Sequence, residues 1–171
     1  MKHAIVSGTF DPMTIGHADV IRRAAQLFDT VTVAVVDNAE KRTLFTAAER
    51  LEIAERAIAA IGETNVSAVA YSGLTSDLMR EKNIKYIVRG VRNASDFDYE
   101  YGMAQIMREF SPGSETVFLP ALPEHMHISS TYVHERITHK SELEGFVPDG
   151  CAALTAEIYE RKTEKSSGNN R

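Results

Sequence analysis

The sequence predicts an α/β fold: one domain built on a five-stranded parallel sheet with helices on both faces. Short β-branched and apolar runs alternate with longer stretches in which apolar residues recur at helical spacing. This alternation is typical of βαβ crossovers between parallel strands. The chain has 171 residues, 43% of them hydrophobic and 25% charged, which is enough for one core of ordinary globular composition. We therefore expect a single Rossmann-like domain over residues 1–162.

The first half of the chain supplies three of the expected strands. Residues 3–7 form the first strand, and a helix follows over residues 16–28. Residues 31–36 (VTVAVV) are almost continuously apolar, which is typical of a strand covered on both faces. Residues 46–61 begin with TAAE, a capping-box pattern that opens a helix. Residues 66–71 then form the third strand.

The second half supplies two more strands and the closing helices. Strands are expected at 85–88 and 116–119, and helices at 76–82, 97–110, 129–139 and 149–162. The last stretch, 163–171 (TEKSSGNNR), is polar, so we expect a disordered tail there. Ligands of open α/β sheets bind outside the carboxyl ends of the strands. Functional residues are therefore expected just after the strands.

Charge, cysteine content and histidine spacing restrict the environment and the partners. The net charge of −5 gives no indication of nucleic-acid binding. Cys151 is the only cysteine, and the N-terminal MKHAIVSG resembles neither a signal peptide nor a membrane span. We therefore expect a cytoplasmic protein with no nucleic-acid or membrane partner. His3, His127, His134 and His139 lack metal-ligand spacing, so no protein-bound metal is expected. The sequence also contains no Walker A motif and no nucleophile elbow.

The first candidate site follows the first strand, in the sequence GTFDPMTIGH. Gly8 permits a tight turn, Thr9 carries a hydroxyl, and Gly16 would let a phosphate approach the free N–H groups of the next helix. His17 would lie at the positive end of that helix, facing the same anion. The alternative is an ordinary strand-to-helix turn with an incidental histidine. The combination of these residues at this place favours a phosphate site.

Three further groups lie where phosphates could bind. Arg89 and Arg92 flank a glycine after a buried strand, an arrangement suited to clamp phosphate oxygens. Residues 129–131 (SST) open a helix and could either cap it or bind phosphate with hydroxyls and N–H groups. Lys41 follows the second strand, where a solvated loop lysine is the ordinary alternative.

These motifs resemble those of the nucleotidyltransferase superfamily with the (T/H)xGH signature. More closely, they resemble the bacterial phosphopantetheine adenylyltransferases. The resemblance rests on GTFDPMTIGH, on RGVR followed by DFDYE, on ISST and on FTAAER, and it covers residues 3–158. It implies transfer of the adenylyl group of ATP to 4′-phosphopantetheine, which gives 3′-dephospho-coenzyme A and pyrophosphate. The resemblance also implies direct in-line displacement, Mg²⁺ accompanying ATP, and a homohexamer.

The resemblance further implies a role for individual residues. The catalytic residues it implies are His17, Lys41 and Arg89, with His17 stabilising the transition state. The acceptor-binding residues it implies are Thr9, Lys41, Thr75 and Arg89. The ATP-binding residues it implies are Thr9, Phe10, His17, Gly90, Val91, Arg92, Glu100, His125, Met126, His127, Ile128, Ser129, Ser130 and Thr131.

Five positions depart from the commonest family pattern. Ser7 stands where proline is frequent, Ile15 where asparagine is frequent, and His125 and His127 replace aromatic or small residues near the expected adenine pocket. His134 takes a place that often holds arginine or lysine. A histidine near the ATP phosphates would be only partly charged at neutral pH. We therefore expect ATP to bind less tightly as the pH rises.

Two alternative functions remain open. One is another adenylyl- or cytidylyltransferase of the superfamily, acting on nicotinamide mononucleotide, flavin mononucleotide or glycerol 3-phosphate. The other is a non-catalytic nucleotide-binding regulator. The RGVR and DFDYE motifs argue against the first, and the presence of His17, Lys41, Arg89 and Arg92 together argues against the second.

Overall fold

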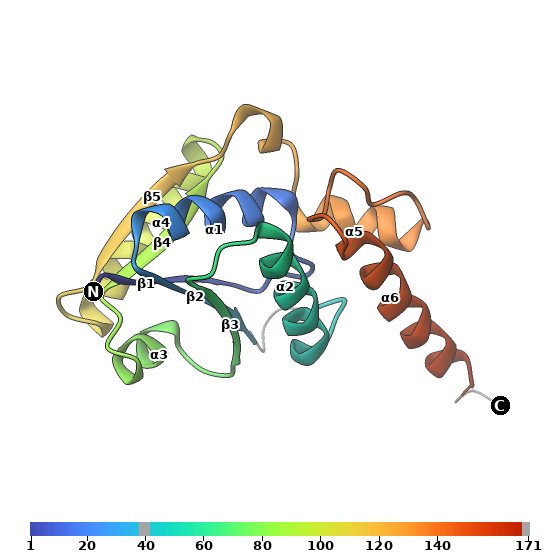
Figure 1. Cartoon of the computed structure of the whole chain (residues 1–171), viewed down its shortest axis with the longest axis horizontal. Helices are drawn as coiled ribbons and strands as arrows, with labels where there is room; N and C mark the ends of the chain where they lie inside the picture. The colour runs from blue at the N-terminus through green and yellow to red at the C-terminus, as the bar shows by residue number, and fades with distance from the viewer. Residues whose placement is uncertain (38–41, 169–171) are drawn as a thin grey trace.

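A five-stranded sheet, parallel throughout, lies at the centre of the molecule (Figure 1). The computed structural model describes residues 1–37 and 42–168, except for the side chains of 165–168. The strand order is β3 (Val66–Tyr71), β2 (Thr30–Val36), β1 (His3–Gly8), β4 (Tyr86–Val91) and β5 (Glu115–Pro120). The chain builds the sheet from β1 out to β3 and then crosses to the other side of β1. The strand order therefore reverses between β1 and β4, which is where ligands bind in open α/β sheets.

Helices cover both faces of the sheet, so the predicted fold class is confirmed. α1 (Ile15–Leu27) and α2 (Ala47–Ile61) pack on one face, and α3 (Thr75–Glu81) and α4 (Ala94–Phe110) lie on the other. A short 3₁₀ helix, η1 (Pro123–His125), leads to α5 (Ser130–Thr138) and α6 (Cys151–Gly168). These last two helices join the core on the side of α1 and α2.

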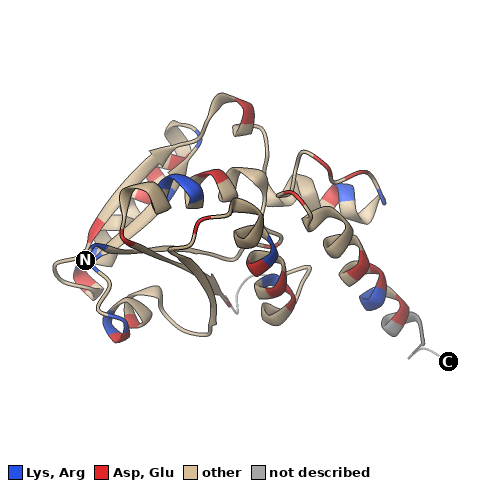
Figure 2. Cartoon of the chain, viewed as in Figure 1, with Lys and Arg blue, Asp and Glu red and all other residues tan. Residues whose placement is uncertain are grey.

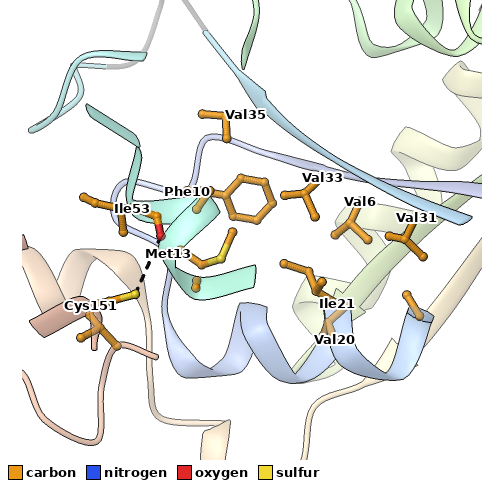
Figure 3. Packing of buried hydrophobic residues seen from close by; sticks show 14 of the residues in the cluster. Val6, Phe10, Met13, Val20, Ile21, Val31, Val33, Val35, Ile53 and Cys151 are labelled. Atoms are coloured by element: carbon orange, nitrogen blue, oxygen red, sulfur yellow. Dashed lines mark hydrogen bonds between the residues drawn. The ribbon is translucent and has the colours of Figure 1, made fainter. Parts of the chain in front are cut away.

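Two apolar clusters, one on each face of the sheet, explain the sequence of the central strands. In β2, Val31, Val33 and Val35 belong to the cluster under α1 and α2, whereas Ala34 belongs to the cluster with α3. The almost continuously apolar run is therefore buried on both faces, as predicted. Full burial of one such side chain contributes about 1.5–3 kcal/mol. Figure 3 shows the larger cluster, which extends from the sheet to Cys151 of α6.

The two helices of the first face begin with capping boxes. In α2, the Thr46 hydroxyl accepts the N–H of Glu49, and the Glu49 carboxylate accepts the N–H of Thr46. Gly62 ends this helix with φ 77°, a left-handed conformation suited to glycine. These predicted boundaries are confirmed. In α1 the box is formed by Thr14 and by the imidazole of His17, so the helix cap and the candidate site share a residue.

Strand β4 is longer than the sequence predicts. Arg89, Gly90 and Val91 pair in register with β5, so the RGVR motif begins inside the strand rather than after it. The following helix begins at Ala94 instead of residue 97, because the Asn93 side chain accepts the N–H of Asp96 and caps the helix there. Strand pairing therefore fixes Arg89, Gly90 and Val91, and Arg92 lies in the short connection to α4.

Helix α6 continues to Gly168, although the sequence predicts a disordered tail from residue 163. The side chain of Lys162 donates to the carbonyl of Leu44, and the hydroxyl of Thr163 donates to the carbonyl of Glu160. These contacts fix the helix in the region where the sequence suggests that it ends. The last three residues of the chain lie outside the described part.

Acidic and basic residues both occur along the ribbons of α2 and α6 (Figure 2). Among the described residues, no helix is long and apolar enough to cross a membrane.

Candidate active site

Two neighbouring cavities open at the carboxyl ends of β1 and β4. Cavity A, of about 220 Å³, is lined by residues that include Thr9, Thr75, Ile87, Arg89, Glu100 and Met103. Cavity B, of about 400 Å³, is lined by residues that include Gly16, His17, Gly90, Arg92, Glu100 and Ser129. A third, smaller cavity of about 170 Å³ overlaps both, because it shares Arg89 with cavity A and His17 with cavity B. The site therefore has two chambers that meet at His17, Arg89 and Glu100.

The imidazole of His17 is held in one tautomer. The backbone N–H of Thr14 donates to His17 Nδ1 over 3.0 Å. A backbone N–H can only donate, so Nδ1 is an acceptor and the proton of the neutral ring lies on Nε2. His17 therefore carries a hydrogen-bond donor, Nε2–H, on the side of the ring away from Thr14.

His17 is neutral at physiological pH in the free protein. Burial, followed by the positive charges of Arg92 and Arg89, lowers the pKa of His17 to about 4. The two arginine charges make the potential at His17 more positive, which would favour an anion beside it. A neutral imidazole can still donate from Nε2 to a phosphate oxygen.

The ring of Phe10 packs edge-on against His17, with 5.1 Å between ring centroids. The ring also lies close to Gly8, where an added Cβ would be 3.0 Å from its Cζ atom. Phe10 is buried and has φ 48°, which is uncommon for an aromatic residue. The absence of a side chain at Gly8 therefore leaves room for the Phe10 ring, which packs against the imidazole of His17.

Arg89 and Glu100 form a two-point ion pair between the chambers. Arg89 Nε lies 2.6 Å from Glu100 Oε2, and Nη2 lies 2.7 Å from Oε1. Arg89 Nη1 also donates to the carbonyl of Ser7 over 2.8 Å. These contacts link β4, α4 and β1 and fix the direction of the guanidinium.

Arg92 is paired in the same way, on the edge of cavity B. Its Nε lies 2.7 Å from Asp96 Oδ2, one turn into α4. A hydrogen bond from Arg92 lowers the pKa of Asp96, so this carboxylate is charged at neutral pH. In the free protein, each of the two arginines predicted to bind phosphate is therefore bound to a carboxylate.

Gly90 has a packing reason as well as a place in the cavity. A Cβ added there would lie 2.9 Å from Cγ2 of Val20 in α1. The glycine thus lets α1 approach β4, and this approach brings His17 of α1 toward Arg89.

Comparison with known proteins identifies the family. The cytidylyltransferase-like family model matches residues 5–136. A phosphopantetheine adenylyltransferase of Methylacidiphilum infernorum is 40% identical over 99% of this chain and 95% of its own length. The enzyme of the same name from Rubrobacter xylanophilus is 41% identical over 96% of this chain and 99% of its own. That from Mannheimia succiniciproducens is 41% identical over 86% and 91%.

The chain belongs to the phosphopantetheine adenylyltransferase family.

Like its relatives, the protein is a nucleotidyltransferase. A solved structure described as a nicotinate-nucleotide adenylyltransferase from Vibrio parahaemolyticus has a TM-score of 0.72 with this chain, covering 93% of it and 96% of its own chain. At 18% identity, this similarity concerns the fold alone.

Most of the residues predicted for this family lie around the two chambers. Cavity A contains the predicted acceptor residues Thr9, Thr75 and Arg89. Seven of the predicted ATP-binding residues line cavity B: His17, Gly90, Arg92, Glu100, His125, Ile128 and Ser129. Phe10 lines the small cavity between them. Lys41 lies outside the described residues.

Other predicted residues lie farther from the chambers. Among the described residues that line cavities A and B, Val91, Met126, His127, Ser130 and Thr131 are absent. Of the two serines that open α5, Ser129 accepts the N–H of Tyr132 as a helix cap, and Ser130 donates to the carbonyl of Pro12. Ser129 therefore caps the helix and also lines cavity B, while phosphate binding by these hydroxyls stays a prediction.

Sequence reasoning gave no role to several residues that build the site. Asp96 pairs with Arg92, while Asp11 and Arg50 bind backbone groups around Phe10. Asp11 lies within GTFDP and Arg50 within FTAAER, so both belonged to recognised motifs. A charged residue at a fixed place inside a recognised motif was the signal in the sequence that could have pointed to them.

His134 is placed differently from the sequence-based expectation. Its Nε2 lies 3.1 Å from Asp11 Oδ2, and it is not among the described residues lining cavity B. In the structure His134 thus pairs with a carboxylate inside the protein, and its expected effect on ATP binding stays a prediction.

Proposed function

We propose that this enzyme transfers the adenylyl group of ATP to 4′-phosphopantetheine, giving 3′-dephospho-coenzyme A and pyrophosphate. The observation that carries the proposal is the meeting of the two cavities at His17, Arg89 and Glu100. A transfer between two anionic substrates requires two binding sites that place the reacting atoms within van der Waals reach.

Cavity A suits the acceptor. Ile87, Met103 and Met107 give it apolar walls for the uncharged pantetheine arm, and Arg89 lies in its lining as a partner for the terminal phosphate. Thr75 begins α3 on the same side. Lys41, as the sequence predicts, would add a second cation for that phosphate.

Cavity B suits ATP. Gly16 and His17 lie in the first turn of α1, whose free N–H groups favour a phosphate. Arg92 adds a guanidinium, and Ser129 adds a hydroxyl at the start of α5. Binding of the triphosphate would draw Arg92 from Asp96, since both carboxylate and phosphate accept bidentate arginine contacts.

The chemistry needs no strong general base. A phosphate oxygen of the acceptor attacks the α-phosphorus of ATP, the bond to the bridging oxygen breaks, and pyrophosphate leaves with that electron pair. His17 Nε2–H and Arg89 stabilise the charge that develops on the α-phosphate oxygens. Nucleophile and leaving group lie on opposite sides of the phosphorus, so the displacement is in line. The acceptor itself attacks the phosphorus, so no covalent enzyme intermediate forms.

The magnesium ion belongs to the substrate, MgATP. Among the described residues, no group of three or more His, Cys, Asp or Glu side chains could hold a metal ion. Mg²⁺ usually keeps several waters and is bound through substrate phosphates, so we propose that it is bound by the triphosphate.

We also propose that the enzyme is a homohexamer and that α4 supplies part of the contact between subunits. Within the described chain, this helix has no buried residue. Tyr99, Met103, Ile106 and Phe110 form an exposed apolar stripe at helical spacing on it. Tyr99 also lines cavity B and Met103 lines cavity A, so a second copy on this stripe would border both chambers. Such a stripe on a soluble helix marks an interaction surface.

The function is tested by measuring pyrophosphate release from MgATP with a panel of acceptors. The panel contains 4′-phosphopantetheine, nicotinamide mononucleotide, flavin mononucleotide and glycerol 3-phosphate. We expect release with 4′-phosphopantetheine and formation of 3′-dephospho-coenzyme A, detected by mass spectrometry. Faster release with another acceptor, or no release with any of them, would contradict the proposal.

A further inference from the structure

Phe10 adopts a backbone conformation that needs support from its surroundings. Its φ of 48° is in the left-handed region, and its ring is 4% exposed and packed against His17. Bulky residues rarely adopt this conformation, and where they do, neighbouring interactions fix it. The residues on both sides of Phe10 are indeed bound from other elements of the fold: Thr9 through its carbonyl and Asp11 through its carboxylate.

Arg50 of α2 binds the peptide before Phe10. The arginine is fully buried, and its Nη1 donates to the carbonyls of Thr9 over 2.7 Å and of Val36 over 3.0 Å. Its Nε donates to the carbonyl of Phe45 over 3.2 Å. One guanidinium therefore joins the ends of β1 and β2 to the start of α2.

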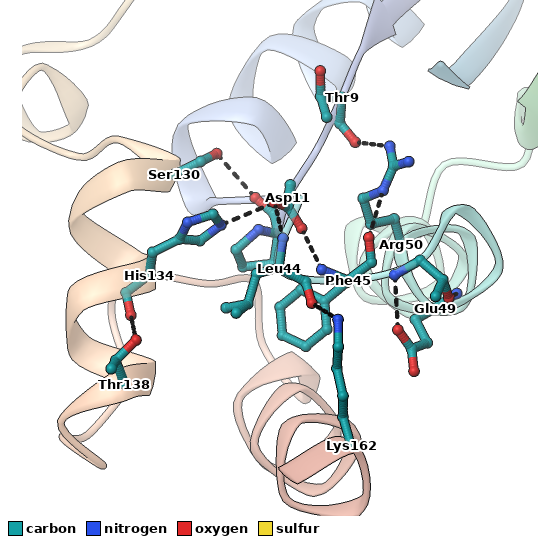
Figure 4. Close-up of polar contacts among 12 residues, drawn as sticks. Thr9, Asp11, Leu44, Phe45, Glu49, Arg50, Ser130, His134, Thr138 and Lys162 are labelled. Atoms are coloured by element: carbon teal, nitrogen blue, oxygen red, sulfur yellow. Dashed lines mark hydrogen bonds and ion pairs between the residues drawn. The ribbon is translucent and has the colours of Figure 1, made fainter. Parts of the chain in front are cut away.

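Asp11, the residue after Phe10, is bound through its carboxylate (Figure 4). Its Oδ1 accepts the N–H of Phe45 over 2.9 Å, and its Oδ2 accepts the N–H of Leu44 over 2.7 Å. The imidazole of His134, from α5, lies 3.1 Å from the same Oδ2. The side chain of Asp11 is only 8% exposed, so its charge needs these partners.

Asp11, Arg50 and His134 would act on the reaction only through other residues. Of the described residues that line cavities A and B, none is Asp11, Arg50 or His134. Their effect would pass through Phe10 to His17, whose ring Phe10 supports.

We infer that Asp11, Arg50 and His134 are positioning residues: they fix the two residues that flank Phe10, Thr9 and Asp11, so that its ring keeps the imidazole of His17 between the two cavities. The inference rests on the role proposed for His17 in adenylyl transfer.

The contact between His134 and Asp11 favours the charged form of both side chains. The hydrogen bond and the negative charge of Asp11 raise the pKa of His134. Burial by itself raises the pKa of Asp11, but His134 and the backbone N–H groups of Leu44 and Phe45 together lower it below its usual value. Asp11 is the charged group against this imidazole, and Lys162 of α6 binds the carbonyl of Leu44 nearby. Neighbours on α5 have other contacts: Arg136 donates to the carbonyl of Glu142. His134 therefore loses its charge, and Asp11 its partner, as the pH rises above the raised pKa.

Activity measurements on the full chain test the inference first. We expect Asp11→Asn and His134→Gln to lower kcat about 10- to 100-fold, because small misplacements of a catalytic group cost rates of this order. The KM for ATP should change less than threefold. His139→Gln is the matched control, since His139 is exposed on the same helix and bonds only within it in the described structure. Unchanged kcat in both test variants would overturn the inference.

The pH profile separates positioning from a general loss of stability. His134 is about one-third exposed (31%), so its replacement should leave the core folded. The wild type should lose kcat as the pH rises from 6.5 to 9, His134→Lys should not, and His134→Gln should have a low kcat throughout. Titration of the acceptor phosphate is the same for the wild type and both variants, so it cannot cause a difference between their pH profiles. The same decline in His134→Lys as in the wild type would contradict the role of the charged pair.

An NMR measurement keeps this test independent of the proposed reaction. The imidazole signals of His17 can be recorded without substrate, and we expect them to shift in Asp11→Asn and in Arg50→Lys but not in His139→Gln. Unshifted signals would overturn the inference. An enzyme that forms no 3′-dephospho-coenzyme A, yet shows these shifts, would refute the proposed function and leave the positioning of His17 intact.

Discussion

Arg89 and Glu100 bind each other through two contacts, of 2.6 and 2.7 Å, at the place where the two cavities meet. Both side chains line cavity A, and Glu100 lines cavity B as well. The Glu100 carboxylate thus orients the Arg89 guanidinium, which the acceptor phosphate would contact. If Arg89 turns toward a phosphate, Glu100 becomes free to accept hydrogen bonds from other groups.

Replacing Glu100 with glutamine should weaken acceptor binding. The neutral amide cannot accept two charged hydrogen bonds, so Arg89 loses its fixed direction. A hydrogen bond to a charged group contributes about 1.5–3 kcal/mol, and partial exposure of this pair reduces the effect. We expect the KM for 4′-phosphopantetheine to rise about tenfold, and that for ATP by less. Glu115→Gln removes an exposed pair with Arg108 and is the control; an equal KM in both variants would contradict the assignment.

His17 should remain neutral from pH 5.5 to 9 in the free enzyme. Its pKa of about 4 lies below the ordinary value of 6.5, mainly because of burial. NMR of ¹⁵N-labelled histidine should show the Nε2–H tautomer throughout this range, as the N–H of Thr14 requires. A His17 signal that titrates near pH 6.5 would contradict this electrostatic description.

The same pKa makes His17 a source of acid instability. Between pH 6.5 and 4 the unfolded chain binds a proton at this position that the folded chain does not, so stability falls as the pH falls. We expect a loss of about 3 kcal/mol over this interval. Urea unfolding should show a smaller loss for His17→Gln than for the wild type, and equal losses would exclude His17 as the cause.

Gly90→Ala should destabilise the fold through Val20. The new methyl group would lie 2.9 Å from Val20 Cγ2, and overpacking of this kind costs about 1–3 kcal/mol. Val20→Ala should restore part of that loss in the double variant, which a double-mutant cycle by urea unfolding would measure. Strictly additive losses would show that the two positions are not coupled.

Ile106→Glu should reduce the size of the assembly. A charge in the exposed stripe of α4 would be buried against a second copy. Light scattering should detect smaller species for this variant, and the wild-type mass for Gln105→Glu, an exposed position outside the stripe. A wild-type mass for both variants would place the subunit contact elsewhere.

The fold was largely predictable, because its signals are local. The β-branched runs marked the strands, and the cap at Thr46 and the glycine at position 62 marked the ends of α2. The ends of β4 and α6 were missed. Pairing with β5 extends β4 through Val91, and a contact with Leu44 fixes α6 at Lys162. Both depend on residues distant in the sequence.

The sequence pointed to the histidine and arginines of the site, but not to the contacts that hold their side chains in place. Motifs placed His17, Arg89 and Arg92 correctly around the cavities. They could not show that Glu100 binds Arg89, because the two residues come together only when α4 packs beside β4. The contact of His134 with Asp11 was missed for the same reason, since nothing in the local sequence shows that α5 faces Asp11.

His17 is proposed to stabilise the transition state between two separately bound anions. The most direct test measures kcat and the dissociation constant for ATP in His17→Ala at saturating 4′-phosphopantetheine. Loss of one preorganised donor should lower kcat by about 100- to 1,000-fold, while the dissociation constant for ATP changes by less than about threefold. An unchanged kcat, with ATP still bound, would contradict the account.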